Sequence, residues 1–380
     1  MARLQRTTLD YLPARVSERA RLYLRPLSLL NGAAATEALE RGTAHVLAGG
    51  PIAFAICELL VRDGDQVLSS SARFEEIEAW AADLTDVQAA RISRLMTLLS
   101  DARTGLDAAP LERPEIMGII NATPDSFSDG GEHLDPRAAI EHGRGLVAAG
   151  ASLLDIGGES TRPDATPVEP DRELARVTPV IVGLAARREE LGGVALSIDS
   201  RHAVVMEAAL ALGVDMINDV TALTGDPASL EVAAASRARV VLMHGPGLSD
   251  GAGPETVYRD PALDVFDYLE SRIAACVDAG IARERLIVDP GIGFGKAGGD
   301  NLAILESLAL FHGLGCPILL GVSRKGLTGA MDRRWPPKER LPGSLAATLY
   351  ALRQGVQFIR SHDVAETCQA VAVWERISRG

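Results

Sequence analysis

Residues 117–131 read MGIINATPDSFSDGG, an apolar run that changes abruptly into polar residues and ends in two glycines. Seven later segments share this design of an apolar stretch that ends in polar residues: SLLDIGGESTRP, ALSIDSR, MINDVTAL, VVLMHG, LIVDPGIGFGK, PILLGVSRK and QFIRSHD. Segments with helical periodicity separate the apolar runs. Strands and helices that alternate eight times predict the α/β class, with a parallel sheet closed into a TIM (β/α)8 barrel.

The expected strands begin near Ile116, Ser152, Ala195, Met216, Val240, Leu286, Pro317 and Gln357. Prolines 136 and 170 stand where the first turn of a helix tolerates proline, and glycines 150, 213, 280 and 355 stand where helices are expected to end. In TIM barrels the chemistry lies at the C-terminal ends of the strands, which is where the polar residues of this chain gather.

Residues 1–113 predict a separate small α/β domain with a linker, in front of a barrel over residues 114–380. Two short strands are expected at LYLRPL and PIAFAICELLVRD, and helices around ATEALERGTAHVL and VQAARISRLMTLL. The stretch SDARTGLDAAPLERPE predicts the linker. Since no motif in this part carries recognisable chemistry, we expect a packing or oligomerisation appendage.

The composition restricts the partners and the compartment. A net charge of -13 argues against nucleic acid or an anionic membrane as the partner, so a site for an anionic substrate must be locally basic. The four cysteines lack metal-ligand spacing and are expected to be reduced. The N-terminus has no apolar signal core and no stretch has about eighteen consecutive apolar residues. These features predict a cytoplasmic protein that acts on small molecules.

Taken together, MGIINATPDSFSDGG, LLDIGGESTRP, SIDSR, INDV, LIVDPGIGFGK, GVSRK and RSHD resemble the dihydropteroate synthase family over residues 114–380. The resemblance implies an enzyme of folate biosynthesis, in the family that sulfonamides target, that joins a dihydropterin diphosphate to 4-aminobenzoate. It also implies a homodimer. Methyltetrahydrofolate methyltransferases share this barrel, but their first-strand loop does not resemble TPDSFSDGG.

A flat pterin edge presents adjacent N–H donors and a carbonyl acceptor, which a carboxylate and a cation or amide could hold in one orientation. Four residues at or near strand ends offer these groups: Asp199, Asn218, Asp289 and Lys325. Buried aspartates need partners, and a ligand edge would supply them. The alternative is that the aspartates pair with Lys325, Arg201 or backbone amides as scaffolding. The resemblance favours the pterin site, with the two aspartates, Lys325 and Arg360 in catalytic roles.

The leaving diphosphate needs positive charge around its oxygens. Arg360 and His362 lie two residues apart on the eighth strand and so should point the same way, as a phosphate clamp. Arg324 on the seventh strand adds positive charge, and Asp363 could open the last helix as its N-cap. Alternatively, the Arg–His pair could form surface ion pairs with residues such as Glu159 or Glu366.

A magnesium ion is expected with the diphosphate. Asn121 is a hard, neutral oxygen ligand at the end of the first strand, suited to a Mg²⁺ ion that keeps most of its waters. The resemblance supports this role, whereas the alternative is a cap that only shapes the following loop. No HExxH motif or Cys/His cluster indicates zinc catalysis.

The glycines of DPGIGFGK fit neither the P-loop nor the dinucleotide-binding spacing, so they indicate a tight turn that lets Phe294 lie near the pterin. Phe294 could instead only plug the barrel mouth. By resemblance, the 4-aminobenzoate pocket is made by the loops TPDSFSDGG and GESTRPDATP, with Thr161, Arg162 and Pro163 as contacts.

Two departures from the family pattern leave alternatives open. The loop after the fifth strand, residues 244–259, is longer than is usual in the family. Gly326 stands where the family commonly has Ser. An active synthase is the first hypothesis, since both departures leave the expected pterin and phosphate ligands in place. A catalytically weak pterin-binding paralogue is the second, and a methyltransferase that would need a corrinoid partner is the third.

Overall fold

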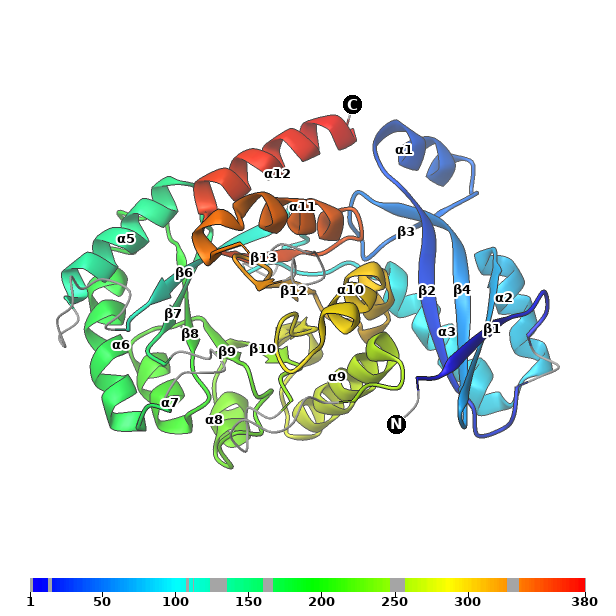
Figure 1. Cartoon of the computed structure of the whole chain (residues 1–380), viewed down its shortest axis with the longest axis horizontal. Coiled ribbons are helices and arrows are strands. Elements are labelled where there is room, and N and C mark those ends of the chain that lie inside the picture. The colour runs from blue at the N-terminus through cyan, green and yellow to red at the C-terminus, as the bar shows by residue number, and fades with distance from the viewer. Residues whose placement is uncertain are drawn as a thin grey trace.

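The computed structural model describes residues 3–12, 16–106, 109–111, 113–123, 135–159, 167–246, 257–326 and 335–379. Two sheets organise these residues: a five-stranded N-terminal sheet and an eight-stranded sheet that forms a barrel (Figure 1). Within the described ranges, no helix has both the length and the apolar character needed to cross a bilayer.

The barrel strands are β6 (Glu115–Asn121), β7 (Leu153–Gly157), β8 (Ala195–Asp199), β9 (Met216–Asp219), β10 (Arg239–Met243), β11 (Leu286–Asp289), β12 (Leu319–Leu320) and β13 (Phe358–Ser361). All neighbouring strands are parallel, in the order β11-β10-β9-β8-β7-β6-β13-β12. A parallel bridge between Val288 and Ile318 brings the two ends of this order together. The predicted TIM barrel is therefore confirmed, and each strand begins within two residues of its expected start.

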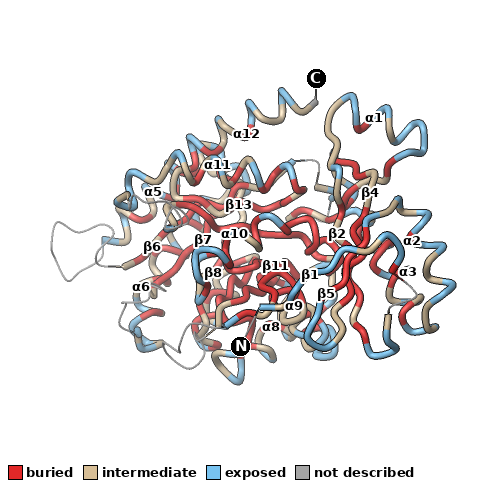
Figure 2. Tube along the Cα trace, turned by 45° about the vertical axis from the view of Figure 1, so that its right-hand side comes forward, coloured by how far each residue is buried: buried red, intermediate tan, exposed pale blue. Residues whose placement is uncertain are grey.

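Helices follow the strands as α5 (Pro136–Ala148), α6 (Pro170–Ala185), α7 (Ala203–Ala211), α8 (Ser229–Ala235), α9 (Pro261–Asp278), α10 (Gly298–Glu306), α11 (Leu341–Leu352) and α12 (Val364–Arg379). Short 3-10 segments are η3 (Arg283–Arg285), η4 (Leu308–Leu314) and η6 (Pro337–Glu339). Prolines 136 and 170 open their helices as expected. Figure 2 shows buried strands inside helices whose outer faces are exposed.

The N-terminal sheet contains β1 (Gln5–Thr8), β2 (Arg21–Leu30), β3 (His45–Val46), β4 (Ala53–Asp63) and β5 (Gln66–Ala72). Its helical segments are α1 (Gly32–Glu40), α2 (Phe74–Trp80), η2 (Ala81–Asp83) and α3 (Asp86–Ser100). The two predicted strands are β2 and β4, and α3 matches the second predicted helix. The first predicted helix, at residues 35–47, is wrong in its second half, where β3 pairs with β4.

The N-terminal sheet docks on the barrel through β2 and β4. Tyr23 of β2 is fully buried and meets Phe266 of α9 edge to face, with the ring centroids 5.5 Å apart. Its hydroxyl donates to both oxygens of Asp267 at 2.9 Å, and Arg21 and Arg62 pair with the same carboxylate at 2.9 and 3.0 Å. An apolar contact enclosed by ion pairs therefore fixes the sheet to α9.

The segment between the two sheets covers the N-terminal end of the barrel. Leu106 and Leu111 pack against a buried cluster with members from seven strands: Met117, Leu153, Met216, Val241, Ile287, Leu319 and Phe358. Arg239, at the start of β10, donates to the carbonyl of Thr104 at 3.1 Å. Because this segment fills the N-terminal end of the barrel, the C-terminal end is the favoured place for a site.

Candidate functional site

Three side chains, those of Arg360, Asp155 and Asp199, meet at the C-terminal end of the barrel. Arg360 of β13 donates from Nε to Oδ2 of Asp155 at 2.6 Å and from Nη2 to Oδ2 of Asp199 at 2.7 Å. Asp155, on β7, is fully buried, and also accepts from Ser197 Oγ at 2.6 Å and from Asn218 Nδ2 at 2.9 Å. Asp155 thus fixes the orientation of both the Arg360 guanidinium and the Asn218 amide.

Asp155 was missed by the sequence analysis, although a signal for it existed. A carboxylate inside the apolar run LLDIG must be bonded once the strand is buried on both faces. Only the fold shows that its partners come from β8, β9 and β13.

Arg360 is bound inside the barrel as well as facing its mouth. A guanidinium at the solvent-facing barrel mouth would contribute little to stability, yet the side chain of Arg360 is only 20% exposed and pairs with the fully buried Asp155. Removing Arg360 would leave that buried carboxylate without its cation, which is strongly destabilising. Its neighbour Asp199 has a raised pKa because of burial, against the opposing effect of the Arg360 charge.

Asp289 and Lys325 form a second group across the barrel mouth. Asp289 is 5% exposed and accepts from the backbone N–H of Gly291 at 2.7 Å. Lys325 donates from Nζ to the carbonyl of Ile292 at 2.6 Å, and this ammonium lies 4.2 Å from the ring centroid of Phe294. Burial lowers the pKa of Lys325 to about 8, while the charge of Asp289 opposes that shift.

The turn that carries Phe294 is built around a buried lysine that the sequence analysis also missed. Lys296 donates from Nζ to the carbonyls of His244, Gly291 and Phe294 at 2.8, 2.7 and 3.0 Å. Gly291 has a φ of +70°, and a Cβ there would lie 2.0 Å from the carbonyl oxygen of His244. The tight turn expected of DPGIGFGK is therefore present, and burial lowers the pKa of Lys296 to about 7.

The charges expected around the diphosphate are partly neutralised within the chain. Arg324 pairs with Asp363, with Nε–Oδ2 and Nη2–Oδ1 distances of 3.0 and 2.5 Å. The carboxylate expected to cap the last helix is therefore bound to Arg324. His362 directly follows β13 and is half-buried, and both its backbone N–H and its Nδ1 contact Ser323 Oγ, at 3.1 and 3.3 Å.

Of the remaining residues expected near the site, the structure describes two, and three lie outside the described residues. Asn121 ends β6 and is half-buried, and Gly326 is exposed, with room for a side chain because its nearest neighbour would lie 3.8 Å from a Cβ. Thr161, Arg162 and Pro163 lie outside the described residues, as does most of the loop after β10.

One cluster among the described residues has the composition of a metal site. The ligand atoms of Glu159, Glu173 and His202 all lie within 4.8 Å of one another. However, Glu159 already accepts from Nε and Nη2 of Arg201 and from the backbone N–H of Val168, each at 3.0 Å. His202 Nδ1 lies 2.6 Å from the carboxylate of the fully buried Glu173. A cation would compete with Arg201, so we assign the cluster to ion pairing.

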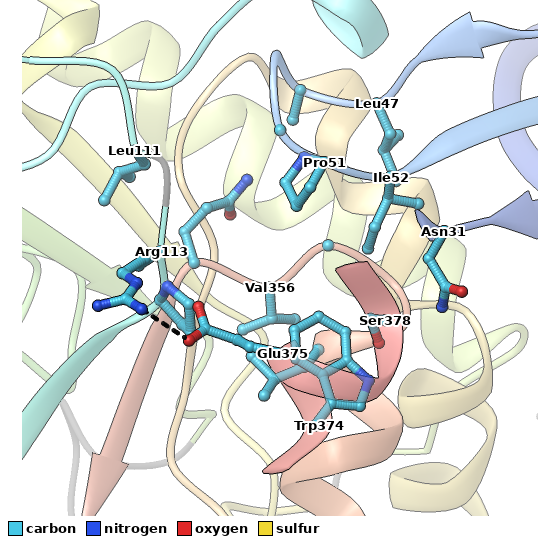
Figure 3. A pocket seen from close by; sticks show the side chains of 16 residues that line it. Asn31, Leu47, Pro51, Ile52, Leu111, Arg113, Val356, Trp374, Glu375 and Ser378 are labelled. Carbon is cyan, nitrogen blue, oxygen red and sulfur yellow. Dashed lines mark ion pairs between the residues drawn. The ribbon is translucent and has the colours of Figure 1, made fainter. Parts of the chain in front are cut away.

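A crevice of about 50 Å³ opens at the other end of the barrel, between the part of the chain that carries the N-terminal sheet and α12 (Figure 3). Leu47, Ile52 and Val356 line it, with Trp374. Its rim holds Glu375, which pairs with Arg113 at 3.5 Å. The crevice lies at the N-terminal strand ends, and the polar array at the opposite end is the better candidate for chemistry.

Comparisons with known proteins match the barrel. A family model described as pterin binding enzyme matches residues 117–362. The dihydropteroate synthase of Neisseria meningitidis serogroup B is 44% identical over 272 residues, which cover 70% of this chain and 94% of that protein. Two solved structures of the Xanthomonas albilineans dihydropteroate synthase, with 4-aminobenzoic acid and with 7,8-dihydropteroate, are 47% and 44% identical. Their TM-scores are 0.65 and 0.63, and each covers 70% of this chain and 94% of the solved chain.

Proposed function

Because the chain belongs to the dihydropteroate synthase family of pterin-binding enzymes, we propose that it joins 6-hydroxymethyl-7,8-dihydropterin diphosphate to 4-aminobenzoate. The products are 7,8-dihydropteroate and diphosphate. The observation that carries the proposal is the array of Asp199, Asn218, Asp289, Lys325 and Arg360 at the C-terminal end of the barrel.

The array suits the two kinds of group on a pterin edge. Among the described residues, the carboxylate of Asp289 accepts one hydrogen bond, from the backbone N–H of Gly291, and so retains acceptor capacity for the ring N–H groups. The ammonium of Lys325 and the amide of Asn218 supply donors for the ring carbonyl and nitrogens. Phe294, beside the Lys325 ammonium, offers an aromatic edge to the flat ligand.

The proposed mechanism begins with cleavage of the bond between the pterin methylene and the diphosphate oxygen. The electron pair leaves with the diphosphate, and positive charge spreads from the methylene into the pterin ring, where Asp199 and Asp289 favour it. Arg360, His362 and Arg324 receive the departing charge, and carboxylates partly offset the charge of both guanidinium groups: Asp155 and Asp199 beside Arg360, and Asp363 beside Arg324.

Attack by the amine completes the reaction. The nitrogen of 4-aminobenzoate forms the new C–N bond and then loses one proton to solvent. An aniline is neutral at pH 7, so no base is needed before attack. A covalent intermediate through cysteine is not favoured, because burial raises the pKa of each thiol. Positioning and electrostatics therefore supply most of the rate.

A Mg²⁺ ion fits this site as a companion of the diphosphate. The donor that we assign to it is the single amide oxygen of Asn121, which suits an ion that keeps its waters and binds substrate phosphates. When bound, the ion would neutralise charge on the diphosphate oxygens.

The second substrate, the oligomer and the compartment extend the proposal. We assign Thr161, Arg162 and Pro163 to the 4-aminobenzoate pocket, because they match the family motif. The carboxylate of that substrate would meet the backbone N–H of Gly326, which lacks the hydroxyl of the usual Ser. We further propose a homodimer in the cytoplasm, which light scattering and cell fractionation would test.

The deciding experiment is an assay of pyrophosphate release with and without 4-aminobenzoate. We expect release that depends on both substrates, with dihydropteroate formed in equal amount. The altered loop after β10 and Gly326 favour a second candidate, a pterin-binding paralogue without activity. That candidate predicts binding of the pterin diphosphate without release of pyrophosphate.

A further inference from the structure

The first strand of the N-terminal domain contacts the catalytic end of the barrel. Arg6 donates from Nε and Nη2 to Oδ2 of Asp260 at 3.0 and 2.8 Å, and Arg3 donates to Oδ1 of Asp300 at 2.5 Å. Between them, the backbone N–H of Leu4 donates to the carbonyl of Arg259 at 2.9 Å. Figure 1 shows the N-terminus beside α9, at the edge of the barrel.

Both carboxylates lie at the start of a helix. Asp260 directly precedes α9 and accepts from the backbone N–H of Leu263 at 3.2 Å, so it caps that helix after the long loop that follows β10. Asp300 lies in the first turn of α10, after the turn that carries Phe294. Their side chains are only 7% and 9% exposed, against 36% and 62% for Arg6 and Arg3.

A short chain of hydrogen bonds connects these positions to the pterin site. Asn301, next to Asp300, accepts from the backbone N–H of Gly293 at 2.7 Å and donates to the carbonyl of Lys296 at 3.0 Å. These two residues flank Phe294. The described ends of the loop after β10 contact the same turn, because Lys296 donates to the carbonyl of His244 and Tyr258 donates to that of Gly295 at 3.4 Å.

We propose that Arg3 and Arg6 are positioning residues for the pterin site, so that the N-terminal residues brace residues 257–260 at the start of α9 and the turn 291–301 that follows β11. The inference rests on the proposed function. The matches to known synthases span nearly all of each relative but only 70% of this chain, and the family model begins at residue 117, so this brace is additional to the shared barrel. A shift of the Phe294 turn would alter pterin binding, because catalytic geometry tolerates little displacement.

The test compares Arg3→Gln/Arg6→Gln with Arg21→Gln in the full chain. Arg21 is a matched control, since its side chain is 40% exposed and binds Asp267 and Glu270, farther along α9 from the catalytic end. We expect the double variant to raise the KM for the pterin diphosphate about fivefold, with turnover within about twofold, since ion pairs whose arginine is exposed are individually weak. The Arg21 variant should keep the wild-type KM. Arg3→Lys/Arg6→Lys should partly restore it.

Amide hydrogen exchange supplies a readout that needs no substrate. Faster exchange at residues 257–260 and 291–301 is expected in the double Gln variant but not in Arg21→Gln. Unchanged KM and exchange in the double variant, or equal changes in both variants, would overturn the inference. Absence of pyrophosphate release from the unaltered chain would instead refute the proposed function, and the exchange comparison would still decide whether the brace exists.

Discussion

Asp289 shows how burial and bonding assign a role at the scale of a single residue. Its carboxylate is nearly enclosed, burial raises its pKa, and Lys325 and the Gly291 N–H oppose that shift. A carboxylate buried this deeply needs further hydrogen-bond donors, and the N–H groups of a pterin would provide them.

We predict that Asp289→Asn lowers pterin affinity at least about tenfold, because an amide turned toward ring donors leaves buried groups unsatisfied. Calorimetric titration of a folded variant measures the loss. Unchanged affinity would refute the assignment of Asp289 to the pterin edge.

Substitution of Asn121 would distinguish a role in metal binding from a role in shaping the loop after β6. If it ligates Mg²⁺ on the diphosphate, Asn121→Ala should weaken binding of the diphosphate substrate about tenfold, but binding of the free hydroxymethylpterin much less. Titrations of both ligands, with and without Mg²⁺, provide the comparison. Equal losses for the two ligands would mean that Asn121 only shapes the loop after β6.

The lowered pKa of Lys325 predicts that the affinity for the pterin depends on pH. Burial lowers its pKa to about 8, so the ammonium is present below that pH and is lost as the pH rises through it. Pterin affinity should therefore be lower above about pH 8 than below it. Lys325→Met removes this titration, and because the ligand and nearby groups such as Lys296 titrate in both proteins, the difference between the two profiles reports Lys325. Identical profiles would contradict a charged donor at this position.

At the scale of the element, β13 places the guanidinium of Arg360 against the carboxylates of Asp155 on β7 and Asp199 on β8 at the barrel mouth. The sequence predicted that Arg360 lies at a strand end, because an apolar run followed by charges is a local signal. It did not predict that the guanidinium meets Asp155, since that contact joins residues 205 positions apart.

We predict that Arg360→Ala lowers turnover about a hundredfold, through loss of a donor to the transition state. It should also lower the free energy of unfolding by about 3 kcal/mol, because Asp155 remains buried without its cation. Adding Asp155→Asn should recover part of the stability and none of the turnover, which distinguishes the two effects. Near-normal pyrophosphate release by Arg360→Ala would contradict the phosphate role.

The two sheets differ in how far the sequence predicts them. Barrel strands are buried on both faces, so continuous apolar runs mark them and their polar ends mark the site. In the N-terminal sheet, β1 reads QRTT and is exposed throughout, and β5 reads QVLSSSA, so neither carries an apolar signal. The contacts of Lys296 and Asp155 also escape prediction, since their partners come from distant parts of the chain.

At the scale of the whole molecule, stability depends on how the N-terminal sheet is held to the barrel. Several of the contacts between them meet at Asp267. Its carboxylate accepts from the buried Tyr23 hydroxyl and from the guanidinium groups of Arg21 and Arg62, and it is 21% exposed. The apolar contact of Tyr23 with Phe266 lies directly beside these bonds. Loss of the carboxylate would remove the acceptor of the buried Tyr23 hydroxyl and one of the two carboxylate partners of both Arg21 and Arg62.

We predict that Asp267→Ala lowers the free energy of unfolding by about 2 kcal/mol, a value reduced for partial solvent exposure. The N-terminal domain should then unfold in a separate, earlier transition, because the contact that couples it to α9 is weakened. Asp65→Asn is the control: Asp65 is 97% exposed and pairs with Arg259 across the same interface, so its loss should change stability by less than about 0.5 kcal/mol. Scanning calorimetry distinguishes the outcomes. A single transition at the wild-type temperature in Asp267→Ala would mean that apolar packing alone holds the sheet to the barrel.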